Sequence, residues 1–206
     1  MCGIVGYVGK ENAASILIEG LSKLEYRGYD SAGIAVQDNS RDKKEIEIIK
    51  AKGRLQALRE MTDNGKAVKG CCGIGHTRWA THGEPSVVNA HPHVSKDKKI
   101  AVVHNGIIEN YQELKEKLLR KGYVFHSSTD TEVIAHLLDY YYKGNCLEAI
   151  TKVLGRVRGS YALGILFQEN PGVMYAVRKD SPLIVGKSSQ GNLIASDVPA
   201  ILKYTK

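Results

Sequence analysis

The second residue of the chain has the greatest potential for chemistry. Initiator methionine is normally removed when the next residue is small, and Cys2 would then carry a free α-amine. An unperturbed thiol has a pKa of about 8.5 and an α-amine one of about 7.7–8.0, so the amine is partly neutral near neutral pH. The amine could therefore act as the base for its own thiol, and a sample that retains Met1 should be inactive. Taken alone, a cysteine at this position is more often a small buried residue at the start of a strand.

A polar cluster that could bind a carboxylate runs from residue 76 to residue 83. Arg78 offers a planar guanidinium that can make two parallel bonds to a carboxylate. Thr81 and His82 add hydrogen-bonding side chains, and Gly83 would allow the segment to flex as a lid. The alternative interpretation is an ordinary polar loop around a buried Trp79.

A second cluster contains Asn105 and Gly106, which follow an apolar run. A side-chain amide beside a glycine N–H is a good source of two hydrogen-bond donors for an oxyanion. The same Asn-Gly pair is also typical of a hairpin turn between two apolar segments. Both interpretations are compatible with the sequence.

A third polar group runs from Thr129 to Glu132 and precedes a helical pattern. We expect it to cap that helix, since Thr and Asp are favoured at helix N-termini. Asp130 could also bind a substrate ammonium group while it does so.

The composition is that of an ordinary globular protein. The 206 residues are 43% hydrophobic and 25% charged, and no linker or repeat divides them, which predicts one domain over residues 1–206. No apolar run approaches the roughly 20 residues needed to span a bilayer, and no leader opens the chain, so we expect a cytoplasmic protein without a membrane partner. The formal charge of +7 is spread out and not interleaved with aromatics, which argues against a nucleic-acid partner.

The four cysteines predict neither disulfides nor a metal site. Cys71 and Cys72 lie in an apolar segment, which favours buried free thiols. Their spacing from the His91-Pro92-His93 segment matches no paired zinc pattern. We therefore expect no metal and no cofactor.

The residues that could do chemistry must be positioned by strands. Hydrophobic periodicity predicts strands over residues 2–9, 34–36, 45–48, 72–76, 100–104, 161–167, 173–178, 183–185 and 193–195. It predicts helices around residues 16–24, 55–61, 111–120, 131–142 and 147–157. Strands, then helices, then strands indicate a layered α+β fold and not a regular βαβ alternation. Cys2 would open the first strand, and the two polar clusters would follow the ends of two others.

Together these residues resemble the class II, or N-terminal nucleophile, amidotransferases. The matching segments cover essentially the whole chain in the family's order, and they are Met1 to Gly6, Glu25 to Gly33, His76 to Gly83, Glu84 to Pro85, Asn89 to His93, Val103 to Asn110 and Thr129 to His136. Within the second and third of these segments, the sequence is similar to the family branch that forms glucosamine 6-phosphate from fructose 6-phosphate.

The resemblance implies an α+β fold, a four-layer αββα sandwich of the N-terminal nucleophile hydrolase type. It implies hydrolysis of glutamine to glutamate and ammonia, with Cys2 as the nucleophile. Asn105 and the Gly106 N–H would form the oxyanion hole. Arg78 and Asp130 would hold the α-carboxylate and the α-amine of glutamine.

The resemblance also implies supporting roles and partners. Trp79, Thr81 and His82 would line a mobile glutamine-binding loop, and Arg27 would support the position of Cys2. Family members of this branch continue into sugar-isomerase domains, so this chain is expected to be the N-terminal part of a longer, homo-oligomeric enzyme. Alone it would hydrolyse glutamine without aminating a sugar.

Two other functions are compatible with the sequence. One is a glutamine-binding module without turnover, which would keep Arg78 and Asp130 but would not need a free amine on Cys2. The other is a family member with a different acceptor, such as a phosphoribosyl amidotransferase.

Overall fold

The computed structural model describes residues 2–38, 45–81 and 83–205, which form two antiparallel sheets stacked face to face. The first sheet contains, in spatial order, β3 (Ile46–Lys52), β2 (Ser31–Gln37), β4 (Cys72–Arg78), β1 (Gly3–Gly9), β10 (Gly191–Ala195) and β9 (Ile184–Lys187). The second sheet contains β5 (His93–Val94), β6 (Ile100–Ile108), β7 (Gly159–Phe167) and β8 (Met174–Lys179).

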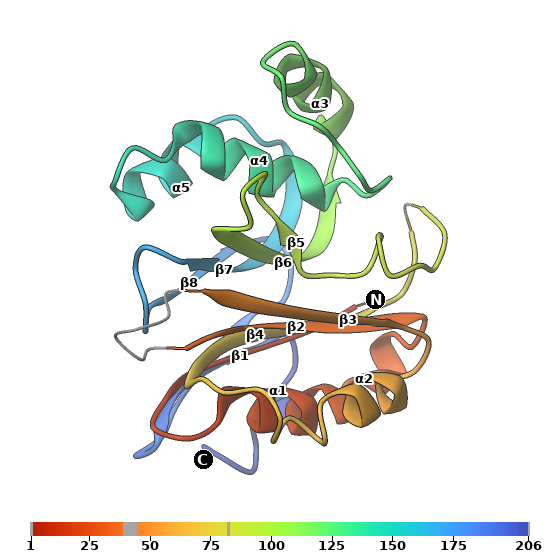
Figure 1. Ribbon diagram of the computed structural model, residues 1–206, viewed down its shortest axis with the longest axis vertical. Helices are drawn as coiled ribbons and strands as arrows, with labels where there is room; N and C mark the ends of the chain where they lie inside the picture. The colour runs from red at the N-terminus through yellow and green to blue at the C-terminus, as the bar shows by residue number, and fades with distance from the viewer. Residues whose placement is uncertain (1, 39–44, 82, 206) are drawn as a thin grey trace.

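Helices cover the outer faces of both sheets (Figure 1). The first sheet is covered by α1 (Ala13–Ser22) and α2 (Leu55–Met61), and the second by α4 (Thr131–Tyr141) and α5 (Cys146–Leu154). The remaining helix, α3 (Tyr111–Leu119), lies against α4, and two 3-10 turns are η1 (Glu25–Arg27) and η2 (Val198–Ala200). The predicted α+β fold with four αββα layers is confirmed.

Three hydrophobic cores separate the four layers. Successive strand residues point to opposite faces, so one strand contributes to two cores. In β1, Val5 and Tyr7 pack toward the helices, whereas Ile4 packs toward the second sheet. In β6, Val102 packs toward its helices and Val103 toward the first sheet. Because both faces are buried, these strands are almost continuously apolar in sequence.

The predicted elements are found, with changes at their ends. β4 and β6 both run past their predicted ends, to Arg78 and Ile108, so the two polar clusters begin inside strands. Two-residue β5 has no periodicity from which to predict it. All four cysteines lie in the described ranges and none forms a disulfide, but Cys71 is half-buried where a buried thiol was expected. None of the helices in the described ranges combines the length and hydropathy that crossing a membrane would need.

Strand register brings the site together at one end of the sandwich. β1 pairs with β4 so that Gly3 lies opposite Thr77, which puts Cys2 next to the end of β4. β6 belongs to the other sheet, and its Asn105 lies within hydrogen-bond distance of Cys2. Two layers of the sandwich therefore supply the residues around Cys2.

Candidate active site

Both the main chain and the side chain of Cys2 are held by neighbours. Its carbonyl oxygen accepts hydrogen bonds from Arg27 Nε at 3.0 Å and from Asn105 Nδ2 at 3.0 Å. Its Sγ accepts from the Trp79 N–H at 3.2 Å. Arg27 is itself fixed by an ion pair with Asp197 at 3.0 Å. The sulfur is thereby aimed at the segment that follows β4.

The surroundings of Cys2 keep its thiol protonated. Burial raises the pKa of the Cys2 thiol, and the nearby Asp30 carboxylate raises it further. The Trp79 N–H and the positive charge of Arg78 lower that pKa, but burial is the largest effect. A base must therefore take the proton before the sulfur can act as a nucleophile.

Asn105 and Gly106 lie inside strand β6, opposite Ala162 and Tyr161 of β7. The hairpin-turn interpretation of this pair is therefore wrong. Gly106 has φ of +119°, and a Cβ there would lie 2.1 Å from the Ser160 carbonyl oxygen, so the backbone can take this shape only as glycine.

His76 fixes the orientation of the Asn105 amide. Its Nε2 lies 3.0 Å from Asn105 Oδ1 and 3.0 Å from the His104 carbonyl oxygen. Both of these atoms are acceptors, so Nε2 carries the proton and donates. Burial lowers the pKa of His76 to about 3, which keeps the ring neutral. With Oδ1 taken by His76, the Nδ2 of Asn105 faces Cys2.

Arg78 is buried at the end of β4 and holds the backbone of the following loop. Its Nη1 donates to the Glu84 carbonyl oxygen at 3.2 Å, and its Nη2 donates to the Gly83 carbonyl oxygen at 3.0 Å. The same side chain lines a cavity beside Cys2. Arg78 is thus placed both to contact a ligand there and to tether the loop.

Asp130 precedes α4 but does not cap it, so the capping prediction is wrong. Its side chain makes no cap hydrogen bond, and Oδ2 instead accepts from the Ile108 N–H at 2.8 Å. Its Oδ1 lies 4.0 Å from His104 Nδ1. The carboxylate therefore links the start of α4 to the end of β6, next to Gly106.

The neighbours of Asp130 are also engaged in the interior. The Thr131 hydroxyl lies 2.8 Å from His91 Nε2 and 2.9 Å from His104 Nδ1. Glu132 accepts from the Ser127 N–H at 2.7 Å and from the Ser127 hydroxyl at 2.6 Å. These contacts link the first turn of α4 to β6, to the segment before β5 and to the loop that precedes the helix. Among the described residues, no group of three or more His, Cys, Asp or Glu side chains could hold a metal ion.

The loop after β4 is the exposed part of the site. Trp79 is 47% exposed, which contradicts the buried tryptophan of the polar-loop interpretation, and it meets the edge of Tyr29 at 5.5 Å between ring centroids. Thr81 lines the cavity, and the Asp30 carboxylate accepts a hydrogen bond from the Ala80 N–H. His82 lies outside the described residues.

The cavity beside Cys2 is small. Its lining includes Cys2, Arg78, Trp79, Thr81, His91, His104, Gly106, Thr129, Asp130 and Thr131. Its volume is about 30 Å³, and since about 10–15 Å³ measured in this way holds one water, it has room for two or three waters at most. An amino-acid substrate would therefore need the exposed loop to move.

Several residues of the site were not identified from sequence, and three of them, Asp30, His76 and Asp197, act from outside the cavity lining. Asp30 accepts a hydrogen bond from the loop that contains Trp79, and Asp197 pairs with Arg27, both from distant segments. His76 orients the Asn105 amide. Asp30 and His76 do lie within the motifs that carry the family resemblance, which was the available signal. Asp197 lies in no such motif.

Comparisons with known proteins show what this chain is similar to. A family model described as a glutamine amidotransferase domain matches residues 76–203. Proteins named glutamine–fructose-6-phosphate aminotransferase (isomerizing), from Caldanaerobacter subterraneus subsp. tengcongensis and Clostridium acetobutylicum, are each 60% identical to the chain over its whole length. The chain covers 33% of each, so it spans about a third of the length of the curated relatives it matches.

Solved structures show the same fold. Glutamine phosphoribosylpyrophosphate amidotransferase from B. subtilis, complexed with ADP and GMP, matches 99% of this chain with a TM-score of 0.84 and 30% identity, over 44% of its own chain. A glutamine aminotransferase class-II domain protein from Silicibacter pomeroyi matches 94% of this chain and 88% of its own, with a TM-score of 0.65 and 16% identity. The second likeness is one of fold alone.

Proposed function

This chain belongs to the glutamine amidotransferase domain family, and from that premise we propose that it releases ammonia from glutamine by way of Cys2. The observation that supports this best is the convergence of separate segments on one cavity. Cys2, Arg78, Gly106 and Asp130 line it, and Asn105 is bonded to Cys2.

In the proposed first step, the α-amine of Cys2, freed by removal of Met1, takes the thiol proton. Met1 lies outside the described residues. The sulfur attacks the side-chain carbonyl carbon of glutamine, and a C–S bond forms while the carbonyl oxygen becomes an oxyanion. Asn105 Nδ2 and the Gly106 N–H stabilise that oxyanion. Its collapse breaks the C–N bond, and ammonia leaves with the proton held by the α-ammonium.

In the second step, water attacks the γ-glutamyl thioester. The α-amine accepts the water proton, the same two donors hold the second oxyanion, and the C–S bond breaks. Glutamate leaves, and the thiol is restored. Arg27 supports both steps as a positioning residue, since it holds the Cys2 carbonyl and never needs to touch the substrate.

Substrate recognition is assigned to the opposite wall of the cavity. Arg78 binds the α-carboxylate of glutamine with two parallel bonds, and Asp130 binds the α-ammonium. Trp79, Thr81 and His82 belong to the loop that must open and close over the substrate. Closure would exclude water from the oxyanion and strengthen the hydrogen bonds to it.

We extend the proposal to a longer enzyme because the curated relatives are about three times as long as this chain. Residues 1–206 would be a single glutaminase domain, and sugar-isomerase domains would use its ammonia to convert fructose 6-phosphate to glucosamine 6-phosphate. The full enzyme would be a homo-oligomer. The chain alone would release ammonia into solution.

The test uses the chain with Met1 removed, as verified by intact mass. It should release ammonia and glutamate in equal amounts, and an electrophilic glutamine analogue should add one adduct at Cys2. A chain that retains Met1 should do neither. If the Met1-bearing chain is equally active, the mechanism through the α-amine is wrong.

A further inference from the structure

A second cavity lies at the edge of the sandwich, where edge strands β3 and β5 of the two sheets meet the start of α4. We call it the edge crevice and define it by Lys50, Val87, Val88, Lys96, Lys98 and Val124. Its volume is about 340 Å³, against about 30 Å³ for the cavity beside Cys2, and the two share no lining residue. It is large enough for a small organic molecule, and the proposed reaction does not use it.

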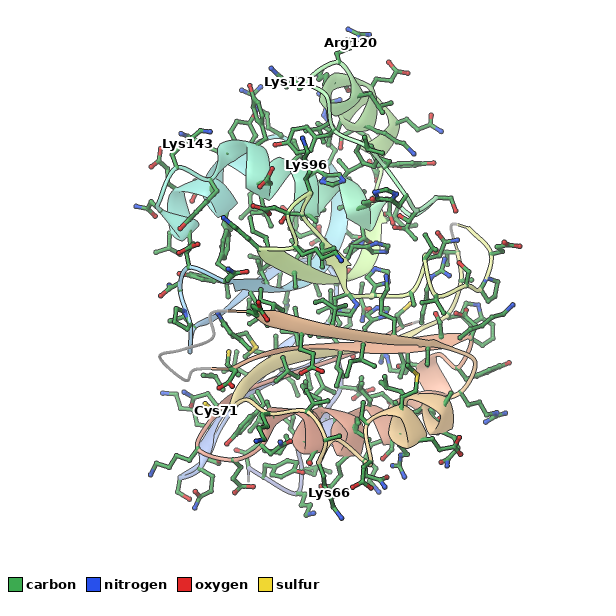
Figure 2. All side chains as sticks on the ribbon, in the orientation of Figure 1. Lys66, Cys71, Lys96, Arg120, Lys121 and Lys143 are labelled. Carbon is green, nitrogen blue, oxygen red and sulfur yellow. The ribbon has the colours of Figure 1, made fainter. Side chains whose placement is uncertain are left out.

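The edge crevice is positively charged. Lys50, Lys96 and Lys98 line it, and within the described residues none of the three forms an ion pair with a carboxylate. Figure 2 shows Lys96 beside β5 and α4. The acidic residue of the lining is Glu132, whose carboxylate already accepts from the His126 N–H and from Ser127. Glu132 is charged and acts on Lys50, but burial affects Lys50 more strongly, and the lining still holds three lysines against one carboxylate.

Lys50 is the cation set deepest in the crevice. Its Nζ donates to the Ala90 carbonyl oxygen at 2.7 Å and to the Val88 carbonyl oxygen at 3.3 Å. An ammonium group has three N–H donors, so one remains for a ligand. Burial lowers the pKa of Lys50 to about 8, so the group still carries its charge at neutral pH.

Part of the crevice lining is apolar. Val87, Val88 and Val124 are 49%, 51% and 59% exposed, and all three line the space. Half-exposed branched side chains gathered beside a cavity are typical of ligand-binding surfaces. A half-buried ammonium beside valines suits a ligand with one negative group and a hydrocarbon part.

We propose that the edge crevice binds a small organic monoanion, a carboxylate with a short unbranched apolar chain. The carboxylate lies against Lys50, with Lys96 and Lys98 at the mouth, and the chain lies against the three valines. A bare phosphate fits less well, because it needs several converging donors and gains nothing from an apolar wall.

The crevice is connected to the candidate active site by the segment that Lys50 holds. Between Val88 and Ala90, the Asn89 side chain donates to the Glu84 carbonyl oxygen at 3.0 Å. Arg78 donates to that same oxygen at 3.2 Å. A carboxylate that pairs with Lys50 competes with the hydrogen bonds by which Lys50 holds this segment. We therefore expect the ligand to change the KM for glutamine about two- to fivefold. This second part rests on the proposed glutaminase function, whereas the binding site does not.

The test is a titration of the isotope-labelled chain with butyrate, followed by amide chemical shifts. Butyrate should cause saturable shifts around the edge crevice, and butylamine, with a similar chain and the opposite charge, should not. Lys50→Met should weaken butyrate binding by more than about tenfold, because it removes the half-buried partner of the carboxylate. Lys66→Met is the matched control, since Lys66 is exposed at the far end of the molecule (Figure 2).

Lys50→Met also removes two bonds to the backbone, so a second variant is needed. The double variant Lys96→Gln with Lys98→Gln changes exposed side chains and should weaken binding about two- to fivefold. The proposal is overturned if butyrate causes no saturable shifts, if butylamine or inorganic phosphate binds as tightly, or if folded Lys50→Met binds butyrate unchanged. Butyrate binding with an unchanged KM for glutamine overturns the connection alone, and a chain without ammonia release refutes the proposed reaction while the binding result stands.

Discussion

The candidate active site has two halves that are held in different ways. Asn105 and Gly106 lie inside a paired strand, and Cys2 directly precedes another. Trp79 and Thr81 lie in an exposed loop that a few polar contacts tether to the body. Sheet pairing fixes the atoms proposed to react, and the loop keeps the freedom that substrate entry requires.

The contrast implies that the two halves of the site contribute to different kinetic constants, which experiments can test. Changes in the strand half should lower kcat, because they displace groups that act in the transition state. Changes in the loop half should raise KM, because they alter how the substrate is enclosed. Any residue that fails to follow this division shows where the two halves are coupled.

The largest effect is expected at Cys2. Cys2→Ala removes the nucleophile and should reduce ammonia release to background, while glutamine still binds. Cys71→Ala is the control, since Cys71 is half-buried, lies outside the cavity and should be dispensable. The readouts are ammonia release and the site of labelling by an electrophilic glutamine analogue. If Cys2→Ala still turns over glutamine and another cysteine is labelled, Cys2 is not the nucleophile. The reaction would then not take place in the strand half.

Three buried histidines near the candidate active site should make the protein sensitive to acid. Burial lowers the pKa of His76 and of His93 to about 3, and it lowers that of His91 as well. The ordinary pKa of histidine is about 6.5. Between that pH and about pH 3, the unfolded chain therefore binds protons that the folded chain does not bind. The free energy of unfolding should therefore fall as pH drops through that window.

His76→Gln tests this acid sensitivity. It should reduce the slope of unfolding free energy against pH by about 1.4 kcal/mol per pH unit between about pH 6 and 4. Urea denaturation across that range gives the slope. His126→Gln is the control, because it makes the same substitution at an exposed histidine. Identical slopes for the parent and His76→Gln would mean that His76 is protonated in the folded state.

The next effect is expected at Asn105. Asn105→Ala should lower kcat by roughly 10²–10³ with little change in KM, since the amide acts on the oxyanion and not on bound glutamine. Asn110→Ala is the matched control, because that side chain bonds Arg156 and Arg158 and lies outside the cavity. Steady-state kinetics separate the two constants. A change confined to KM would move Asn105 to the substrate-binding half.

Arg78 lies at the junction of the two halves. Arg78→Lys should raise the KM for glutamine about 10- to 100-fold, because a point charge replaces two charge-assisted bonds to a carboxylate. An amide substrate without the α-carboxylate should lose little. If both substrates are impaired equally, Arg78 serves only to hold the Gly83 and Glu84 carbonyls, and carboxylate recognition is the wrong role.

Apolar periodicity predicted most elements because it records burial directly, and the family resemblance implied the four layers. The predictions from sequence were wrong where contacts between residues far apart in the chain determine the local structure. Asn-Gly is typical of a turn, but β7 pairs with Asn105 and Gly106 and keeps them in a strand. Asp130 has a capping composition, yet its carboxylate bonds the Ile108 N–H, which only the tertiary fold brings near. The role of His76 likewise depends on a contact between two sheets.

The smallest effect is expected at Asp30, which tethers the loop from the start of β2. One carboxylate oxygen accepts from the Ala80 N–H and the other from the Ser31 hydroxyl at 3.0 Å. In Asp30→Asn the amide oxygen can keep Ala80, and the Ser31 hydroxyl can rotate to accept from the amide nitrogen. Only the charge is then lost, so KM should rise about two- to fivefold with kcat unchanged.

The same substitution gives a second, opposite signal in the strand half. The Asp30 charge raises the pKa of the Cys2 thiol, so its removal should lower that pKa and speed alkylation of Cys2 at neutral pH. Ser31→Ala is the control, because it leaves the carboxylate charge in place and should leave the alkylation rate unchanged. If Asp30→Asn instead lowers kcat tenfold at constant KM, the loop tether also positions the nucleophile. Strand and loop would then act as one unit, and the division between them would fail at the point where Trp79 contacts the Cys2 sulfur.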